Sequence, residues 1–151
     1  MIIVKQEKDQ KAIASAFSIR QTVFVEEQGV PKLIEFDGND DKAIHVIAYE
    51  EGMPVGCARL LIAQSGAKIG RVAVLKAYRK RGIGEALCHA LIDIAKQMDI
   101  MHVYLHAQAS AKAFYEKIGF TTVGESFYEA DILHYKMEKN INDHLAEEKD
   151  E

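Results

Sequence analysis

The stretch from Lys68 to Met98, KIGRVAVLKAYRKRGIGEALCHALIDIAKQM, has the pattern of a strand, a turn and a helix. Val72 and Val74 suit a strand, and Gly82 and Gly84 mark a turn. Apolar residues then recur at helical spacing at Ile83, Ala86, Leu87, Ala90, Leu91, Ile94, Ala95 and Met98. The sequence therefore predicts a helix that begins at about Gly82, and it places Cys88 on the polar side of that helix.

The turn before this helix holds three consecutive basic residues, Arg79, Lys80 and Arg81. The first N–H groups of a helix have no partner within the helix, and the helix dipole makes this end positive. Fixed positive charge beside these amides favours a polyanion, most simply a pyrophosphate. The alternative interpretation is an ordinary glycine turn with a solvated basic tip.

Two other phosphate-binding loops do not fit this stretch. A P-loop needs Lys and then Ser or Thr directly after its second glycine, whereas Gly84 is followed by Glu85 and Ala86. A dinucleotide-binding loop needs a third glycine, whereas this segment continues with Glu85, Ala86 and Leu87. The basic turn therefore predicts a different kind of polyanion site.

Two motifs resemble those of a known family. Arg79, Gly82 and Gly84 resemble the acyl-CoA signature [QR]-x-x-G-x-[GA] of the GNAT superfamily of N-acetyltransferases. Downstream, residues 108–120 resemble its segment N-x-x-A-x-x-[LF]-Y-x-x-x-G-F, with Gln108 where the family usually has Asn. The resemblance covers roughly residues 1–139. Residues 20–28, together with Asp37 and Gly38, also resemble the ElaA-like branch of the superfamily.

The resemblance implies a mixed α/β fold with a mostly antiparallel central sheet of six to seven strands and about four helices. We expect one domain over residues 1–139 and a charged tail over residues 140–151. Local signals agree with this order, since Asp9 suits the N-cap of a first helix and Gly119 suits the C-cap of a later one. Ser110 is expected to cap the start of that later helix.

The resemblance also implies acetyl-CoA as the acyl donor and no metal. Main-chain groups of Val72 to Val74 would bind the pantetheine arm, as an added strand does. The residues implied for the cofactor are Val72, Ala73, Val74, Arg79, Lys80, Arg81, Gly82, Ile83, Gly84 and Gln108.

For the chemistry, the resemblance implies Tyr115 as the general acid that protonates the departing thiolate. Glu26, Glu27 and Asp37 follow the first predicted helix, where the family's acceptor site begins, and they are candidates for contacting a cationic amine. His134 is a further candidate on this acceptor side. The general base stays open among Glu26, Glu27, His134 and an ordered water.

The function that we expect is transfer of an acetyl group from acetyl-CoA to a primary amine of a small molecule or peptide. The alternative is a non-catalytic acyl-CoA-binding or sensor module with the same site. Nothing in the sequence identifies the acceptor, and the sequence leaves a homodimer open.

The composition argues against several other classes of protein. The net charge of −4 over 151 residues argues against a general nucleic-acid or membrane surface. Cys57 and Cys88 lack metal-ligand spacing, so we expect free thiols in a reducing cytoplasm. No stretch approaches the ~20 apolar residues of a membrane span. We therefore expect a soluble, cytoplasmic protein.

Overall fold

The computed structural model describes residues 1–141. The described chain divides into two compact units, one formed by Met1–Leu61 with Ile69–Leu91 and one formed by Ile62–Lys68 with residues 92–141. The elements up to the long helix are β1 (Ile2–Glu7), α1 (Gln10–Arg20), the π-helix η1 (Gln21–Glu27), α2 (Lys32–Glu35), η2 (Asp40–Lys42), β2 (Ile44–Glu50), β3 (Met53–Ala63), β4 (Gly66–Val74), η3 (Lys76–Tyr78) and α3 (Ile83–Gln97). The remaining elements are β5 (His102–Gln108), η4 (Ala109–Ala111), α4 (Lys112–Ile118), β6 (Thr121–Thr122), β7 (Phe127–Glu129) and β8 (Ile132–Asn140).

The strands are hydrogen-bonded in the order β1-β2-β3-β4-β5-β8-β6, and β7 pairs with β8. The pairings β1–β2, β2–β3, β5–β8, β6–β8 and β7–β8 are antiparallel. The predicted mixed α/β fold with a mostly antiparallel sheet is confirmed, with eight strands and four α-helices among residues 1–141 in place of six to seven strands and about four helices.

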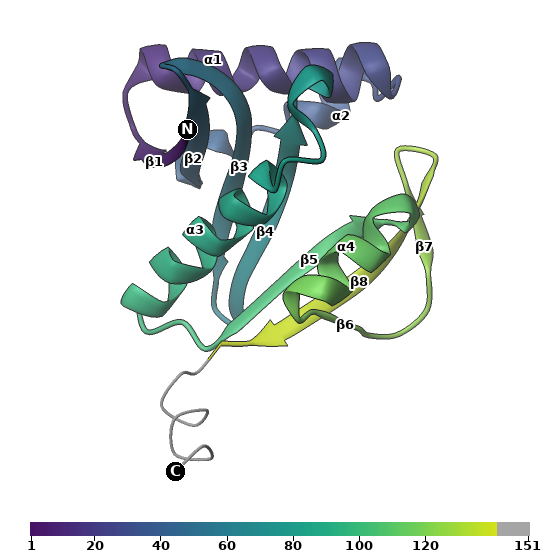
Figure 1. The fold of residues 1–151 in the computed structure, drawn as a ribbon. Coiled ribbons are helices and arrows are strands. Elements are labelled where there is room, and N and C mark those ends of the chain that lie inside the picture. Colours follow the sequence, from purple (N-terminus) through teal and green to yellow (C-terminus); the bar gives the residue numbers. More distant parts are fainter. Residues whose placement is uncertain (142–151) are drawn as a thin grey trace. The chain divides into compact units, whose positions relative to one another are not determined.

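In the first unit, α1 packs on one face of the central strands. Asp9 caps this helix as predicted, because its side chain accepts a hydrogen bond from the Lys11 N–H at 3.2 Å. The core on this face consists of Ala16, Ile19, Val23, Ile47, Cys57 and Ala73. Figure 1 shows α1 running across β2, β3 and β4, the strands that carry Ile47, Cys57 and Ala73.

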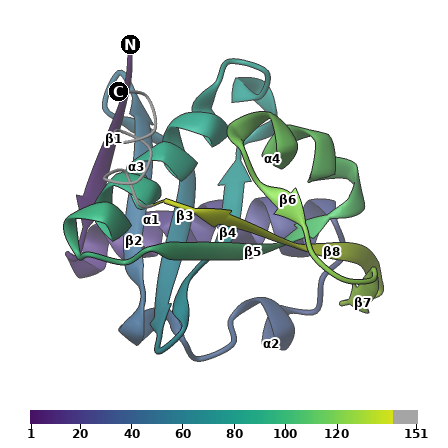
Figure 2. The same ribbon diagram turned by 90° about the horizontal axis from the view of Figure 1, so that it is seen from below.

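The opposite face of the same strands is covered by the first part of α3 (Figure 2). A Cβ added at Gly56 would lie 3.1 Å from the Ala73 carbonyl oxygen and 3.2 Å from Leu87 Cδ1. Since successive strand residues face opposite sides of a sheet, Gly56 meets α3 while Cys57 meets α1. The absence of a side chain at Gly56 therefore lets α3 approach the backbone of β3 closely.

The placement of Cys88 on a polar helix face was wrong. Cys88 is fully buried, as are Leu87 and Leu91, so the buried face of α3 is wider than a narrow helical stripe. Both cysteines are free, as predicted, and burial raises the pKa of Cys57 and Cys88 to about 12. They are therefore packing residues with little thiolate at neutral pH.

In the second unit, β5 has one buried and one half-exposed face. Val103, Leu105 and Ala107 are buried, whereas the residues between them are partly exposed. The predicted C-cap is confirmed, because Gly119 has a φ of 108° and its N–H bonds to the Glu116 carbonyl. The predicted Ser110 cap was wrong, because Ser110 lies inside the η4 turn and Ala111 takes the N-cap position.

The predicted tail begins within the last strand and then leaves the described residues. β8 extends to Asn140, and Ile141 is buried, with its N–H bonded to the Met101 carbonyl at 2.8 Å. Residues 142–151 lie outside the described part of the chain. Within residues 1–141, no helix combines the length and apolar character needed to cross a bilayer.

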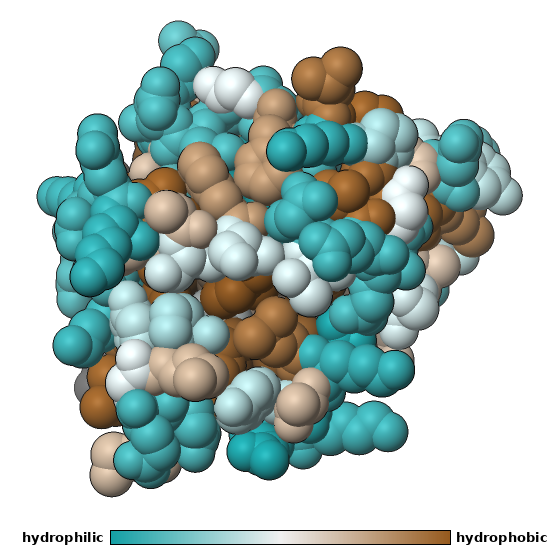
Figure 3. Space-filling view, turned by 90° about the horizontal axis from the view of Figure 1, so that it is seen from above, coloured by the Kyte–Doolittle hydropathy of each residue, from teal (hydrophilic) through white to brown (hydrophobic). Residues whose placement is uncertain are grey.

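Exposed apolar side chains occur on separate elements. Leu33 on α2, Met53 on β3 and Tyr128 on β7 are 91%, 57% and 73% exposed. Figure 3 shows one face of the molecule, on which apolar residues reach the surface at several places among polar ones. Single exposed apolar residues are normal on soluble domains, so they do not by themselves indicate a partner.

The close approach at Gly56 yields a stability prediction. Gly56→Ala should lower the free energy of unfolding by about 1–3 kcal/mol, because its Cβ would press on Ala73 O, Leu87 and Ile83. Gly70→Ala is the matched control, since its Cβ would meet only Arg59 Nε, at 4.0 Å, and it should be near neutral. Urea unfolding of both variants measures the difference, and equal stabilities would contradict the packing constraint.

Candidate functional site

The basic turn of the first unit leads directly into α3. The helix begins at Ile83, and the Ala86 N–H makes an intrahelical bond to the Gly82 carbonyl at 3.0 Å. Lys80 and Gly82 have φ angles of 65° and 81°, so the turn has two residues in the left-handed region. The first N–H groups of α3 have no partner within the helix, and they follow this turn directly in the chain. The predicted helix start is confirmed to within one residue.

The three basic residues of the turn have different environments. Lys80 and Arg81 are exposed, and the Arg81 guanidinium lies 5.4 Å from the centroid of the Tyr78 ring. Arg79 instead donates from Nε to the Val74 carbonyl oxygen at 2.8 Å, and from Nη1 and Nη2 to the two carboxylate oxygens of Glu27, each at 2.8 Å. Arg79 is therefore paired with a carboxylate, whereas the exposed Lys80 and Arg81 supply the remaining positive charge of the turn.

Glu27 was a candidate for contacting an acceptor amine, and the structure pairs it with Arg79. The hydrogen bonds from Arg79 lower the pKa of the Glu27 carboxyl. Glu26, its neighbour on η1, is exposed. Glu27 therefore stays ionised but is already engaged by a guanidinium.

The strand that precedes the turn contains one irregular residue. Arg71 has a φ of 53° within β4, a left-handed conformation that is uncommon for a residue other than glycine. Its guanidinium donates from Nε to the Glu35 carbonyl at 3.1 Å and from Nη2 to the Ile34 carbonyl at 3.2 Å. Arg71 therefore attaches α2 to β4, one residue before Val72.

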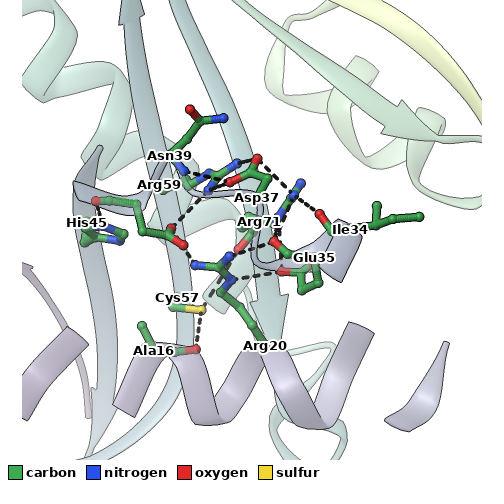
Figure 4. Close-up of polar contacts among 11 residues, drawn as sticks. Ala16, Arg20, Ile34, Glu35, Asp37, Asn39, His45, Cys57, Arg59 and Arg71 are labelled. Atoms are coloured by element: carbon green, nitrogen blue, oxygen red, sulfur yellow. Dashed lines mark hydrogen bonds and ion pairs between the residues drawn. The ribbon is translucent and has the colours of Figure 1, made fainter. Parts of the chain in front are cut away.

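A charge network lies between α1, β3, β4 and the segment that follows η1 (Figure 4). It joins three arginines to three carboxylates, namely Arg20, Arg59 and Arg71 with Glu35, Asp37 and Asp40. The shortest contacts are Arg59 Nη2 to Asp37 Oδ2 at 2.6 Å and Arg20 Nη1 to Asp40 Oδ1 at 2.7 Å. The formal charges of these six groups cancel.

The network changes the interpretation of the acidic segment. Asp37 was expected to contact a cationic acceptor, but its carboxylate bonds to Arg59 and Arg71. The hydrogen bond from Arg59 holds the pKa of the Asp37 carboxyl well below its usual range. Burial raises the pKa of Glu35 against the pull of Arg71 and Arg20. These carboxylates are therefore used internally.

Tyr115 and Gln108 belong to the second unit. Tyr115 is buried on α4, its ring makes edge contacts with Phe114 and Phe120 at centroid distances of 4.9 and 6.1 Å, and its carbonyl accepts the Phe120 N–H. Gln108 is the last residue of β5 and is half-buried. Packing thus fixes the orientation of the Tyr115 ring.

A cluster that the sequence did not reveal joins three strands of the second unit. His106 on β5 lies 2.8 Å from Glu129 on β7, and His134 on β8 has its Nε2 3.9 Å from the same carboxylate. The His134 Nδ1–H donates to the Ile132 carbonyl at 2.7 Å. Burial lowers the pKa of His106 against the pull of Glu129. The cluster forms because His134 and Phe127 are register partners, which brings β7 beside β8.

Comparison with known proteins decides the family. The family model described as an acetyltransferase (GNAT) domain matches residues 4–141. This chain belongs to the GNAT acetyltransferase family. Acetyl transfer is the general chemistry of that family, and the described residues contain no group of His, Cys, Asp and Glu side chains that could hold a metal ion.

Relatives of this GNAT chain include an ElaA protein, which the sequence motifs also suggested. The uncharacterized N-acetyltransferase YjcF of Bacillus subtilis is 34% identical over 134 residues, which cover 88% of this chain and 96% of that protein. ElaA of Escherichia coli is 31% identical over 129 residues, which cover 82% and 84% of the two chains. Its crystal structure superposes with a TM-score of 0.83, covering 93% of this chain and all of that chain.

A more distant GNAT neighbour shares the fold alone. It is an aminoglycoside 6'-N-acetyltransferase solved in complex with coenzyme A, with a TM-score of 0.76 and 17% identity, covering 92% of this chain and 97% of that one.

The charge network of this GNAT chain predicts a pH-dependent stability. The Asp37 pKa is depressed in the folded state, so the carboxylate stabilises the protein above its unfolded pKa of ~3.9, and this stabilisation is lost as the pH falls from there toward the folded value. Asp37→Asn should therefore lower the free energy of unfolding at pH 7 by about 1–2 kcal/mol, a value reduced for its partial exposure.

The measurement is urea unfolding of wild type and Asp37→Asn at pH 7 and at several values below pH 4. The difference between them should shrink as the pH falls. Asp41→Asn removes an exposed carboxylate of the same segment and should change stability by less than about 0.5 kcal/mol. A wild-type advantage over Asp37→Asn that stayed constant down to low pH would contradict the assigned pairing.

Proposed function

We propose that this GNAT protein is an N-acetyltransferase that transfers the acetyl group of acetyl-CoA to a primary amine of a small molecule or peptide. The observation that carries the proposal is the start of α3, where the first helix amides lie beside the exposed Lys80 and Arg81 at the end of β4. Such an arrangement binds a pyrophosphate without further groups. The coenzyme A complex of the distant GNAT neighbour supports the choice of ligand.

In the proposed reaction, the amine nitrogen attacks the thioester carbonyl carbon, a C–N bond forms and the C–S bond breaks. The amine loses a proton, and the thiolate that leaves gains one. A main-chain N–H of Val72, Ala73 or Val74 would polarise the carbonyl, a contribution of about 2.7–4 kcal/mol where such donors have been removed. Alignment of the two reactants supplies most of the remaining acceleration.

We propose that Tyr115 donates the proton that the departing thiolate gains, on the basis of the position of Tyr115 in the second motif. A phenol of pKa ~10 can donate to a sulfur whose free thiol has a pKa of ~8.5. For the base, the fork of hydrogen bonds from Arg79 makes Glu27 a poor choice, because its pKa is lowered. Glu26, His134 and an ordered water remain the candidates.

The experiment that tests the function is a coupled thiol-release assay with acetyl-CoA over polyamines, amino sugars, amino acids, aminoglycosides and peptide N-termini. Amine-dependent thiol release supports the enzyme. Tight acetyl-CoA binding without release for any amine would instead support a non-catalytic acyl-CoA-binding or sensor module. A cytoplasmic location is part of the proposal, since Cys57 and Cys88 are free thiols that suit a reducing compartment.

The phosphate loop predicts the effect of a charge at Gly82. Gly82→Asp should abolish measurable acetyl-CoA binding, because the φ of 81° strains a side chain there and the carboxylate repels the pyrophosphate. A Cβ at Gly82 meets no atom within 4 Å, so Gly82→Ala controls for the strain without the charge. Calorimetry measures the affinity, and a folded Gly82→Asp protein with wild-type affinity would show that the loop does not hold the pyrophosphate.

Tyr115→Phe separates proton donation from packing. The ring and its contacts with Phe114 and Phe120 are kept, so stability and acetyl-CoA affinity should hold, while kcat should fall by ~10²-fold or more. The pH profile supplies the second readout. Wild type should lose activity at high pH as the phenol ionises, and the variant should lack that limb. Wild-type kcat with the same alkaline limb, with chemistry rate-limiting, would make Tyr115 a packing residue.

A further inference from the structure

Arg79 occupies the first position of the acyl-CoA signature, yet its guanidinium is directed to protein groups. It makes three hydrogen bonds, each 2.8 Å long, to the Val74 carbonyl and to both oxygens of Glu27. A fork of two parallel bonds is the strongest geometry for an arginine and a carboxylate. One side chain thus joins the end of β4, the start of the basic turn and the end of η1.

The π-helix η1 determines where Glu27 points. The chain continues from α1 into seven residues of π-helix that end at Glu27. A π-helix turns less per residue than an α-helix does, so six steps from Gln21 direct Glu27 roughly a quarter turn away from its α-helical direction. Short π-helical segments are frequent at functional sites. The irregular winding is therefore what aims this carboxylate at Arg79.

We propose that Glu27 and Arg79 are positioning residues that hold the shape of the acetyl-CoA loop, and that Arg79 is not itself a ligand of the pyrophosphate. This inference rests on the proposed function. The cofactor charge is met by Lys80, Arg81 and the first amides of α3, while the Glu27–Arg79 pair holds the start of the turn against Val74. Both paired side chains are about one-third exposed, at 35% each, so the pair is accessible to substitution without opening the core.

The two roles of Arg79 predict opposite results. Arg79→Lys keeps the charge but loses the fork, since a lysine is a point charge with flexible donors. If Arg79 positions the loop, Arg79→Lys should weaken acetyl-CoA binding about tenfold. If Arg79 contacts phosphate directly, Arg79→Lys should keep most of the affinity, because lysine also binds phosphate. Glu27→Gln discriminates further, because removing a negative charge near a direct phosphate contact should tighten binding, whereas loss of positioning should weaken it.

The experiment is a double-mutant cycle on acetyl-CoA affinity, measured by calorimetry with Glu27→Gln, Arg79→Lys and the double variant. We expect each single change to weaken acetyl-CoA binding about tenfold relative to wild type. The double variant should also bind only about tenfold more weakly than wild type, because both changes break the same pair. Asp41→Asn, in an exposed carboxylate elsewhere in the first unit, should leave acetyl-CoA affinity unchanged. Thermal midpoints are measured in parallel to confirm that all variants are folded.

The salt dependence of acetyl-CoA affinity gives an independent readout, because substitution of a residue that only positions the loop should leave it unchanged. Lys80→Gln and Arg81→Gln should each reduce the loss of acetyl-CoA affinity with added salt, because a screened contact has been removed. Arg79→Gln removes the charge of Arg79 and should nevertheless keep the wild-type salt dependence, because that charge is paired with Glu27. A reduced salt dependence in Arg79→Gln, tighter binding by Glu27→Gln, or additive effects in the double variant would each overturn the positioning role. If wild type binds acetyl-CoA and one of these results appears, the inference alone fails. If wild type does not bind acetyl-CoA, the proposed function fails with it.

Discussion

The structure of the first unit depends on the close packing of α3 against β3 at Gly56. A Cβ at this position would lie within 3.3 Å of Ala73 O, Leu87 and Ile83. The side chains of α3 therefore pack directly on the backbone of β3, and there is no room for a larger residue at position 56. The chain after β4 is tied to the same strand, since the Leu75 N–H bonds to the Val55 carbonyl at 2.9 Å. Because both ends of the basic turn are held in this way, the start of α3 has a defined position at the end of β4.

A second constraint comes from the buried charges. Arg20 and Arg59 are 1% and 3% exposed, and burying either one without its carboxylate partners would be strongly unfavourable. Such networks contribute little net stability, but they restrict the segment to arrangements in which every charge is paired. Here the segment from Glu35 to Asp40 is held by arginines from α1, β3 and β4. The segment after η1 is thus positioned by polar contacts, and not by an apolar core of its own.

These pairings bear on recognition of the acceptor. The carboxylates that suggested a cationic acceptor are engaged, Asp37 by Arg59 and Arg71 and Glu27 by Arg79. An ion pair of this kind has much less attraction for a further cation than a single carboxylate does, because the two charges nearly cancel at a distance. Of the three acceptor candidates Glu26, Glu27 and Asp37, only the exposed Glu26 is not paired with an arginine of the network or the turn. These carboxylates should therefore attract a cationic acceptor less strongly than the sequence suggested.

Local signals in the sequence determined the elements. The turn and helix start at Gly82 and Ile83, the N-cap at Asp9 and the left-handed C-cap at Gly119 all depend on residues within a few positions of one another, so they could be read directly. Two local predictions failed where packing or a short turn decided the outcome, namely the exposure of Cys88 and the cap at Ser110.

The pairings between distant residues were decided by tertiary structure. Arg79 and Glu27 are 52 positions apart, and Arg59 and Asp37 are 22 apart. The charges of these side chains are evident from the sequence, but which of them meet depends on strand register, on the left-handed conformation at Arg71 and on the winding of η1. The sequence by itself therefore determined the fold class, the family motifs and the basic turn. Only the folded chain decided which charges are used internally and which remain at the surface, because pairing requires a geometry that no local pattern specifies.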